Sequence, residues 1–292
     1  MKKILLMFSL VFLVLAVTFS VSAKTAYTED ETTKIIDGVV YKLSADELQK
    51  NEYDVEKLYK FTEEIIFLET NSKISIEISE FDGWKKLKSV TFPEKCGIIT
   101  IGESAFKNCK ALETVTFPKE SVNITIGKTA FYDCEKLQDL TFPEKCGTLT
   151  IGNQAFRYCD NIKTLTFPKK SGDISIGKYA FYNCSGITKI KNTGNIVKID
   201  DRAFQGCKSL TSVTISDKTK FIGEYAFYDC RALKKVYVNS KKDAPKLERT
   251  IFAWTHKKFE IIAKNETAAK SWKKALTKVG SKTIKVCYIE SV

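Results

Sequence analysis

A phrase of nine residues recurs along this chain at an almost constant interval, and it constrains the fold more than any other feature. One copy is Ile-Gly-Lys-Thr-Ala-Phe-Tyr-Asp-Cys at residues 126–134. Its phenylalanine recurs every 25 residues, except for two steps of 23, at Phe81, Phe106, Phe131, Phe156, Phe181, Phe204, Phe227 and Phe252. A fixed period in this range predicts a solenoid, which grows by stacking turns and has no single central core.

Six of the nine cysteines occupy one slot of the repeat, at Cys109, Cys134, Cys159, Cys184, Cys207 and Cys230. Equivalent residues of stacked strands lie about 4.8 Å apart and point the same way. A disulfide needs Cβ atoms about 3.5–4.5 Å apart that face each other. We therefore expect reduced, buried thiols that act as small apolar residues, beside a buried column of phenylalanines. Cys96 and Cys146 share a second slot, filled by Ser121 and Ser171 in alternate repeats, which indicates a duplicated unit of two repeats.

Each repeat contains two short strand patterns joined by a turn. Leu112-x-x-Val115-x-Phe117 has the spacing L-x-x-L-x-L, which is typical of the strand in a leucine-rich repeat. The segment Ala-Phe-x-x-Cys is too short for a helix and predicts a turn or a 3₁₀ piece. The glycine of the phrase predicts a positive φ at a bend, since Asp200, which tolerates that conformation, replaces it once.

The segments outside the repeats predict an exported chain with a cap at each end. Residues 1–23 have a charged start, an apolar run and a small-residue end, as in a cleaved signal peptide. An uncleaved anchor is the alternative, because the apolar run is long enough to span a membrane. Residues 24–73 predict a cap with a hairpin at residues 35–41 and a short helix within residues 45–61. Residues 74–257 hold about eight repeats, and residues 258–292 predict a β-α-β cap.

The full phrase Ile-Gly-x-x-Ala-Phe-x-x-Cys-x-x-Leu-x-x-Val-Thr-Phe-Pro resembles the BspA-like, or treponemal-type, leucine-rich repeat family over about residues 74–238. This resemblance implies a right-handed solenoid on an exported or cell-surface protein of a bacterium or protist. It also implies a role in adhesion to host matrix or to other cells, and it brings no catalytic residues to this chain.

Charge and composition narrow the possible partners. The net charge is +12, which favours acidic proteins, anionic glycans or membrane surfaces. We expect no nucleic-acid partner, because no known nucleic-acid motif is present and the chain has an export signal. The single histidine, His256, lies in the degenerate last repeat, and paired Cys or His at metal-ligand spacing is missing. We therefore expect no enzyme activity, no cofactor and no metal site.

Two surfaces are candidates for binding. The outward positions of the L-x-x-V-x-F strands form a polar face that becomes basic toward the C-terminal end, with Lys88, Thr91, Thr116, Thr141, Lys163, Thr166, Lys189, Lys191, Lys234, Lys235 and Tyr237. An aromatic strip follows the phenylalanine column, with Tyr132, Tyr158, Tyr182 and Tyr228, and with Tyr179 and Tyr225 nearby. Each has a structural alternative, since threonine suits any exposed strand and tyrosines can pack flat over their neighbours.

The sequence thus predicts a secreted or cell-surface binding module, adhesin-like, for an extracellular protein or anionic glycan. We expect no integral membrane segment once the signal peptide is cleaved. The alternative function is a structural spacer of the cell envelope that has no specific ligand.

Overall fold

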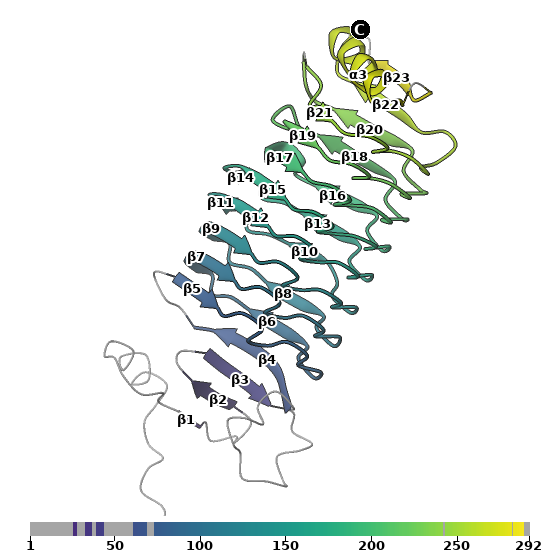
Figure 1. Cartoon of the computed structure of the whole chain (residues 1–292). Coiled ribbons are helices and arrows are strands. Elements are labelled where there is room, and N and C mark those ends of the chain that lie inside the picture. The colour runs from purple at the N-terminus through teal and green to yellow at the C-terminus, as the bar shows by residue number, and fades with distance from the viewer. Residues whose placement is uncertain are drawn as a thin grey trace, which may run out of the picture.

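The computed structural model describes residues 26–27, 33–36, 39–43, 61–68, 73–241, 243–281 and 283–288. They form a β-solenoid of about 9 turns, with antiparallel strands at one end and a single helix at the other (Figure 1). The predicted leucine-rich-repeat solenoid is therefore confirmed. The predicted signal peptide and the helix predicted within residues 45–61 lie outside the described residues, apart from Phe61.

The N-terminal strands extend the solenoid by antiparallel pairing. Strands β1 (Ala26–Tyr27), β2 (Thr33–Ile36), β3 (Val39–Leu43) and β4 (Thr62–Phe67) pair in that order. In the predicted hairpin, Ile36 pairs with Val39. Strand β4 then pairs in parallel with the first repeat strand. The antiparallel strands therefore cover an edge that would otherwise leave backbone groups unpaired.

One row of strands comes from the L-x-x-V-x-F segments, and we call it the first ribbon. It runs from β4 through β6 (Ser89–Thr91), β8 (Thr114–Thr116), β10 (Leu140–Thr141), β13 (Thr164–Thr166), β16 (Lys189–Lys191), β18 (Ser212–Ile215) and β20 (Lys235–Val238). Parallel pairing joins equivalent residues of successive turns, for example Leu140 with Leu165. This register puts equivalent side chains in columns along the solenoid axis.

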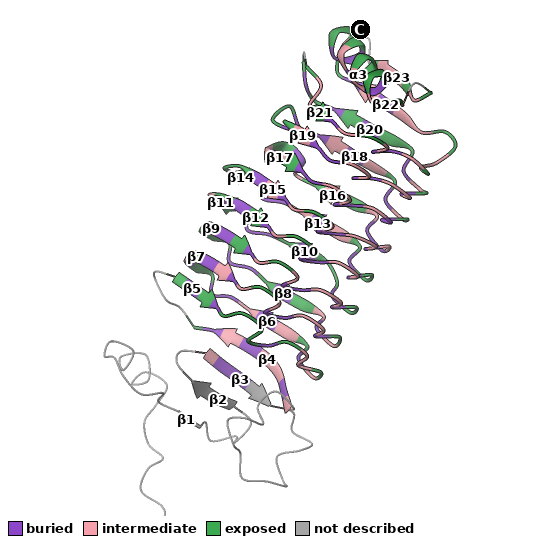
Figure 2. Ribbon diagram, in the orientation of Figure 1, coloured by how far each residue is buried: buried purple, intermediate pink, exposed green. Residues whose placement is uncertain are grey.

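A second ribbon carries the segments that precede the Gly-x-x-Ala-Phe turns. It comprises β5 (Lys73–Ile76), β7 (Lys95–Ile101), β9 (Glu120–Ile126), β11 (Lys145–Cys146), β12 (Leu149–Ile151), β14 (Lys170–Ser171), β15 (Ile174–Ile176), β17 (Ile196–Ile199), β19 (Phe221–Ile222) and β21 (Lys246–Leu247). A short 3₁₀ helix, η4 (Thr193–Asn195), precedes β17. Buried and exposed residues alternate along these strands (Figure 2), so one side of each ribbon faces the core.

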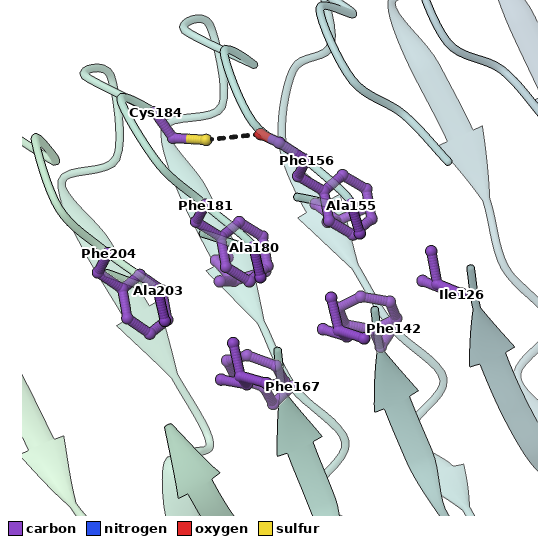
Figure 3. Packing of buried hydrophobic residues seen from close by; sticks show 14 of the residues in the cluster. Ile126, Phe142, Ala155, Phe156, Phe167, Ala180, Phe181, Cys184, Ala203 and Phe204 are labelled. Atoms are coloured by element: carbon purple, nitrogen blue, oxygen red, sulfur yellow. Dashed lines mark hydrogen bonds between the residues drawn. The ribbon is translucent and has the colours of Figure 1, made fainter. Parts of the chain in front are cut away.

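The core contains two stacked columns of phenylalanine. The predicted column from Phe81 to Phe252 is buried throughout, with ring centroids 5.0 Å apart at one end and 5.6 Å at the other. A second column, from Phe67 to Phe167, comes largely from the Phe-Pro ends of the first-ribbon strands. Figure 3 shows members of both columns around Phe156 and Phe167. The second column has no counterpart after Phe167, where Asn192 and Ile215 take its slot.

The six cysteines of the repeat slot are free and buried, as the sequence predicts. Each thiol donates a hydrogen bond to the carbonyl oxygen of the phenylalanine in the preceding turn. The Sγ–O distance is 3.1 Å from Cys134 to Phe106 and 2.9 Å from Cys184 to Phe156, and Figure 3 draws the second bond. Each cysteine therefore also links two adjacent turns.

The positive φ predicted for the glycine that recurs in the repeat is wrong. Gly127 does not have a positive φ; the positive values fall two and six residues later, at Thr129 (54°) and Asp133 (62°). A Cβ on Gly127 would lie 2.6 Å from the carbonyl carbon of Gly102 in the preceding turn, so glycine is required there by close approach. The two left-handed residues are four positions apart, and the amides of Thr129, Phe131 and Asp133 all donate to the next turn.

The C-terminal end is the expected strand–helix–strand unit. Strands β22 (Glu260–Ala263) and β23 (Lys285–Tyr288) continue the parallel pairing of β20, and α3 (Glu266–Lys278) lies between them in sequence. The side chain of Asn265 caps the helix by accepting from the Ala268 amide at 2.9 Å. Trp272 is fully buried on its inner face, so α3 closes this end of the core.

Candidate binding surfaces

The strand face predicted from sequence lies along the first ribbon, whose strand pairing is interrupted between β8 and β10 and between β16 and β18. Its register pairs Thr91 with Thr116, and Thr141 with Thr166 and then with Lys191. All residues predicted for this face are exposed or partly exposed. The structure therefore places the predicted face residues in columns on one surface, while their role in binding stays a prediction.

Charge is distributed unevenly along this strand face. The N-terminal turns carry Glu63, Glu64, Glu113 and Asp139, and Lys88 there is paired with Glu63 at 2.8 Å. The later turns carry Lys163, Lys189, Lys191, Lys234 and Lys235, all exposed. In the part of the chain that the structure describes, none of these five lysines lies within ion-pair distance of a carboxylate. The face thus changes from acidic to basic along the axis.

A shallow hollow lies where the two charge regions meet. It has a volume of about 530 Å³ and is lined by Glu113, Lys136, Gln138, Asp139, Asn161 and Lys163. The outward columns were visible in the sequence, but a hollow depends on how adjacent loops close beside the strands. Sequence patterns therefore did not indicate it.

The predicted aromatic strip lies on the turns, and its rings contact one another. Tyr132 meets Tyr158 edge-on with ring centroids 5.6 Å apart, and Tyr158 meets Tyr182 at 5.9 Å. Further along, Tyr228 lies 5.3 Å from Tyr225. The six tyrosines are half-buried. The packing alternative is therefore partly correct for these rings, although each keeps an accessible portion.

Three large residues outside the predicted set complete this strip. The guanidinium of Arg157 lies 4.7 Å from the ring centroids of both Tyr158 and Tyr182. Arg202 lies between the other two tyrosines, 5.5 Å from Tyr179 and 4.7 Å from Tyr225. Trp254 stacks on Tyr228 at 6.0 Å. We call the whole set the tyrosine–arginine ridge: Tyr132, Arg157, Tyr158, Tyr179, Tyr182, Arg202, Tyr225, Tyr228 and Trp254.

A signal for the overlooked residues was present in the repeat. Arg157 directly follows a column phenylalanine, as Tyr132 and Tyr182 do. Arg202 directly precedes the Ala-Phe pair, as Tyr179 and Tyr225 do. The residues that share a slot with these tyrosines in other turns, whatever their type, therefore include Arg157 and Arg202.

A ladder of opposite charges lies where the chain passes from the first ribbon to the second ribbon in successive turns. Lys119 pairs with Glu94 at 2.9 Å, Lys145 with Glu120 at 2.5 Å and Lys169 with Glu144 at 3.4 Å. These pairs are exposed, so each adds little to stability. Beside them Cys96 and Cys146 are buried, and burial raises the pKa of Cys146 to about 11. That thiol is therefore protonated and weakly nucleophilic near neutral pH.

Side chains that could bind a metal ion are not clustered in the described ranges. No cluster of three or more His, Cys, Asp and Glu side chains there is placed to hold a metal ion. The Nδ1 atom of His256 accepts from the Lys258 amide at 3.0 Å. Within those same ranges no helix combines the length and the apolar composition that crossing a membrane requires.

The family model of the BspA type leucine rich repeat region matches this chain in six copies, over residues 56–175 and 174–292. The chain belongs to this family. The strand face and the tyrosine–arginine ridge are therefore both built from BspA-type repeats. Repeat arrays of this kind act as protein-interaction modules and are typically not enzymes.

Solved structures with the same kind of repeat are similar to this BspA-type chain. A leucine-rich repeat protein from Bacteroides ovatus is 19% identical to this chain, with a TM-score of 0.53. The matched region covers 93% of this chain and 67% of the Bacteroides chain. A leucine rich repeat protein of T. pallidum is 16% identical, with 87% and 92% covered and a TM-score of 0.44. The first of these supports the fold. No curated protein matches the sequence.

Proposed function

We propose that this chain is an exported, adhesin-like binding module without enzymatic activity. It recognises an extracellular protein or an anionic glycan through the basic half of the strand face. The observation that supports this most is that Lys189, Lys191, Lys234 and Lys235 are exposed and lack carboxylate partners among the described residues. These unneutralised charges lie in two turns separated by the turn of β18, and they suit many weak contacts with an acidic surface.

The test is a combined charge reversal of these lysines. The full chain, purified after export, is screened against extracellular-matrix proteins, acidic glycans and whole cells at low and moderate salt. For each ligand found, we expect affinity to fall as salt rises. The variant with Lys189, Lys191, Lys234 and Lys235 all changed to Glu should lose most of that affinity, while single changes have little effect.

A matched control separates the strand face from net charge. Changing Lys257, Lys258, Lys273 and Lys274 to Glu alters the net charge by the same amount at exposed positions outside the first ribbon. This control variant should keep its affinity. If both variants lose affinity equally, or neither loses any, the strand face is not the binding surface.

A folded protein that binds nothing in the screen would support the second function, a structural spacer of the cell envelope. The continuous stacked core favours that alternative, because it makes a stable rod without any ligand. Export is tested separately by sequencing the N-terminus of the secreted chain. We expect it to start at Lys24, and a retained apolar segment would support the uncleaved anchor.

A further inference from the structure

Several large side chains of the tyrosine–arginine ridge stand in a backbone conformation that such residues rarely adopt. The φ angles are 66° at Tyr158, 57° at Tyr179, 58° at Arg202, 57° at Tyr225 and 58° at Trp254. Left-handed backbone is unfavourable for bulky side chains and is tolerated best by glycine, asparagine and aspartate.

Other turns show what the fold itself prefers at the same slots. The slot of Tyr158 and Trp254 holds Asn108, Asp133 and Asn183 in other turns. The slot of Tyr179, Arg202 and Tyr225 holds Ser104, Thr129 and Gln154. The solenoid therefore forms with small or polar residues at these positions, and the large ones are not needed for the turn.

Burial does not compensate for this strain. Trp254 is 66% exposed, and the ridge tyrosines are only half-buried. Strained backbone that carries accessible aromatic side chains is a pattern associated with binding sites. These aromatic residues are thus better explained by contact with a partner than by folding.

The two ridge arginines indicate the charge of that partner. Arg157 donates from Nη1 to Gln154 at 2.9 Å and from Nη2 to the Tyr158 hydroxyl at 2.8 Å, while its Nε is buried and unpaired. Across the described residues, neither Arg157 nor Arg202 forms an ion pair with a carboxylate. Both guanidinium groups make cation–π contact with tyrosine rings, at 4.7 Å from the centroid of Tyr158 for Arg157 and of Tyr225 for Arg202. Their free N–H groups suit a carboxylate or sulfate.

The regularity of the ridge indicates that the partner is a polymer. Successive turns are spaced by 5.0–5.6 Å, as the phenylalanine column shows. Aromatic rings and guanidinium groups therefore recur along a line at intervals comparable to one sugar ring. Aromatic faces stack on the apolar faces of sugars, and guanidinium groups bind acidic substituents. We propose that the tyrosine–arginine ridge binds an anionic polysaccharide along the solenoid axis. This inference rests on the binding function proposed above and adds a surface distinct from the strand face.

The test uses polymers that separate ring stacking from charge. Polygalacturonate carries carboxylates on sugar rings, poly-glutamate carries carboxylates without rings, dextran is neutral, and dextran sulfate replaces carboxylate by sulfate. The full chain should bind polygalacturonate or dextran sulfate more tightly than poly-glutamate, and dextran weakly. Ligand binding should also change the fluorescence of the exposed Trp254.

The decisive variant replaces the strained aromatics with residues that the chain already uses at the same slots: Tyr158→Asn, Tyr179→Gln, Tyr225→Gln and Trp254→Asn. Its thermal stability should be unchanged or higher, because the strain is relieved. Its affinity for the acidic polysaccharides should fall by about tenfold or more, toward the value for poly-glutamate. A second variant, Arg157→Gln with Arg202→Gln, should lose the preference for acidic over neutral polysaccharide.

The outcomes separate this inference from the proposed function. Loss of polysaccharide affinity in the ridge variants, with affinity kept in the Lys189, Lys191, Lys234 and Lys235 reversal, supports the ridge. Loss only in the lysine reversal overturns the ridge and leaves the strand face as the site. Equal affinity for polygalacturonate and poly-glutamate, or no binding to any acidic polysaccharide, also overturns the ridge, while matrix proteins still test the proposed function.

Discussion

The thiol of Cys184 donates a hydrogen bond to the carbonyl oxygen of Phe156 in the preceding turn, with a Sγ–O distance of 2.9 Å. The same bond recurs from Cys109 to Phe81 and from Cys230 to Phe204. A disulfide between adjacent members of this column would remove two such bonds. The ladder therefore keeps its thiols reduced through geometry even if the chain is exported to an oxidising compartment.

Thiol titration tests this ladder. Denaturation without reductant should release six or more reactive thiols per chain, because the ladder cysteines are free. In the native chain only the half-buried Cys287 should react quickly with a disulfide reagent. Cys287→Ser should then remove the fast phase. Two or fewer thiols after denaturation would contradict the ladder.

Alkaline pH should destabilise the fold through these same cysteines. Burial raises the pKa of Cys109 to about 12, whereas an unfolded thiol ionises near pH 8.5. Between those values the native chain holds a proton that the unfolded chain has lost, so stability falls as pH rises, by up to about 1.4 kcal/mol per pH unit for each buried thiol. Urea midpoints measured from pH 8 upward should show this slope. Cys109→Ala should make it shallower, and an unchanged slope would contradict the explanation.

Removing one ring from the central phenylalanine column should be strongly destabilising. Phe131 is fully buried and stacks on Phe106 and Phe156, each at 5.1 Å. Phe131→Ala should lower the free energy of unfolding by about 3–5 kcal/mol, and Phe131→Leu, which keeps an apolar side chain, by about 1 kcal/mol. Denaturant unfolding measures both, and a loss for Phe131→Ala no larger than that for Phe131→Leu would contradict a stabilising role for the buried side-chain volume at this position.

Glycine should be required where adjacent turns come closest. A Cβ at position 127 would lie 2.6–2.8 Å from backbone atoms of Gly102 and Glu103, so Gly127→Ala should destabilise the chain by about 1–3 kcal/mol. Gly194 is the matched control, because nothing lies within 4 Å of a Cβ there. Gly127→Ala should lower the melting temperature more than Gly194→Ala does. Equal melting temperatures would be inconsistent with the close approach at Gly127.

The charge ladder should be sensitive to sign and to salt. Lys119 lies between Glu94 and Glu144 in adjacent turns and pairs with Glu94 at 2.9 Å. Lys119→Glu would put three carboxylates in one column and should lower stability by about 1 kcal/mol at low salt. Lys119→Gln should have a smaller effect. High salt should remove most of the difference between the two variants, and a difference that persists in salt would exclude repulsion as its cause.

Much of the fold was predictable because every turn repeats the same core residues. Phe131 and Cys134 keep their type in most repeats, and in-register stacking then places both columns directly. The C-terminal β-α-β unit was also predicted, since its apolar spacing changes where the repeat ends. The second phenylalanine column was overlooked because Phe142 and Phe167 precede proline and were interpreted as strand ends.

The turn conformation could not be predicted from single residues. Thr129 and Tyr158 are not residues that suggest left-handed backbone, yet both adopt it. What imposes it is the next turn, whose carbonyls accept from alternate amides such as those of Thr129 and Phe131. The prediction for Gly127 failed for the same reason, because the crowding there also comes from a neighbouring turn.

The alternating charge ladder also limits how such a protein can change in length during evolution. Its column reads Glu94, Lys119, Glu144 and Lys169, so neighbouring turns carry opposite signs. Duplication of a single turn would place like charges next to each other, whereas duplication of a pair preserves the alternation. Cys96 and Cys146 alternate with Ser121 and Ser171 in the same rhythm. In this part of the chain the pair of turns is therefore the unit that keeps opposite charges adjacent in this column, and we expect turns here to be gained or lost in pairs.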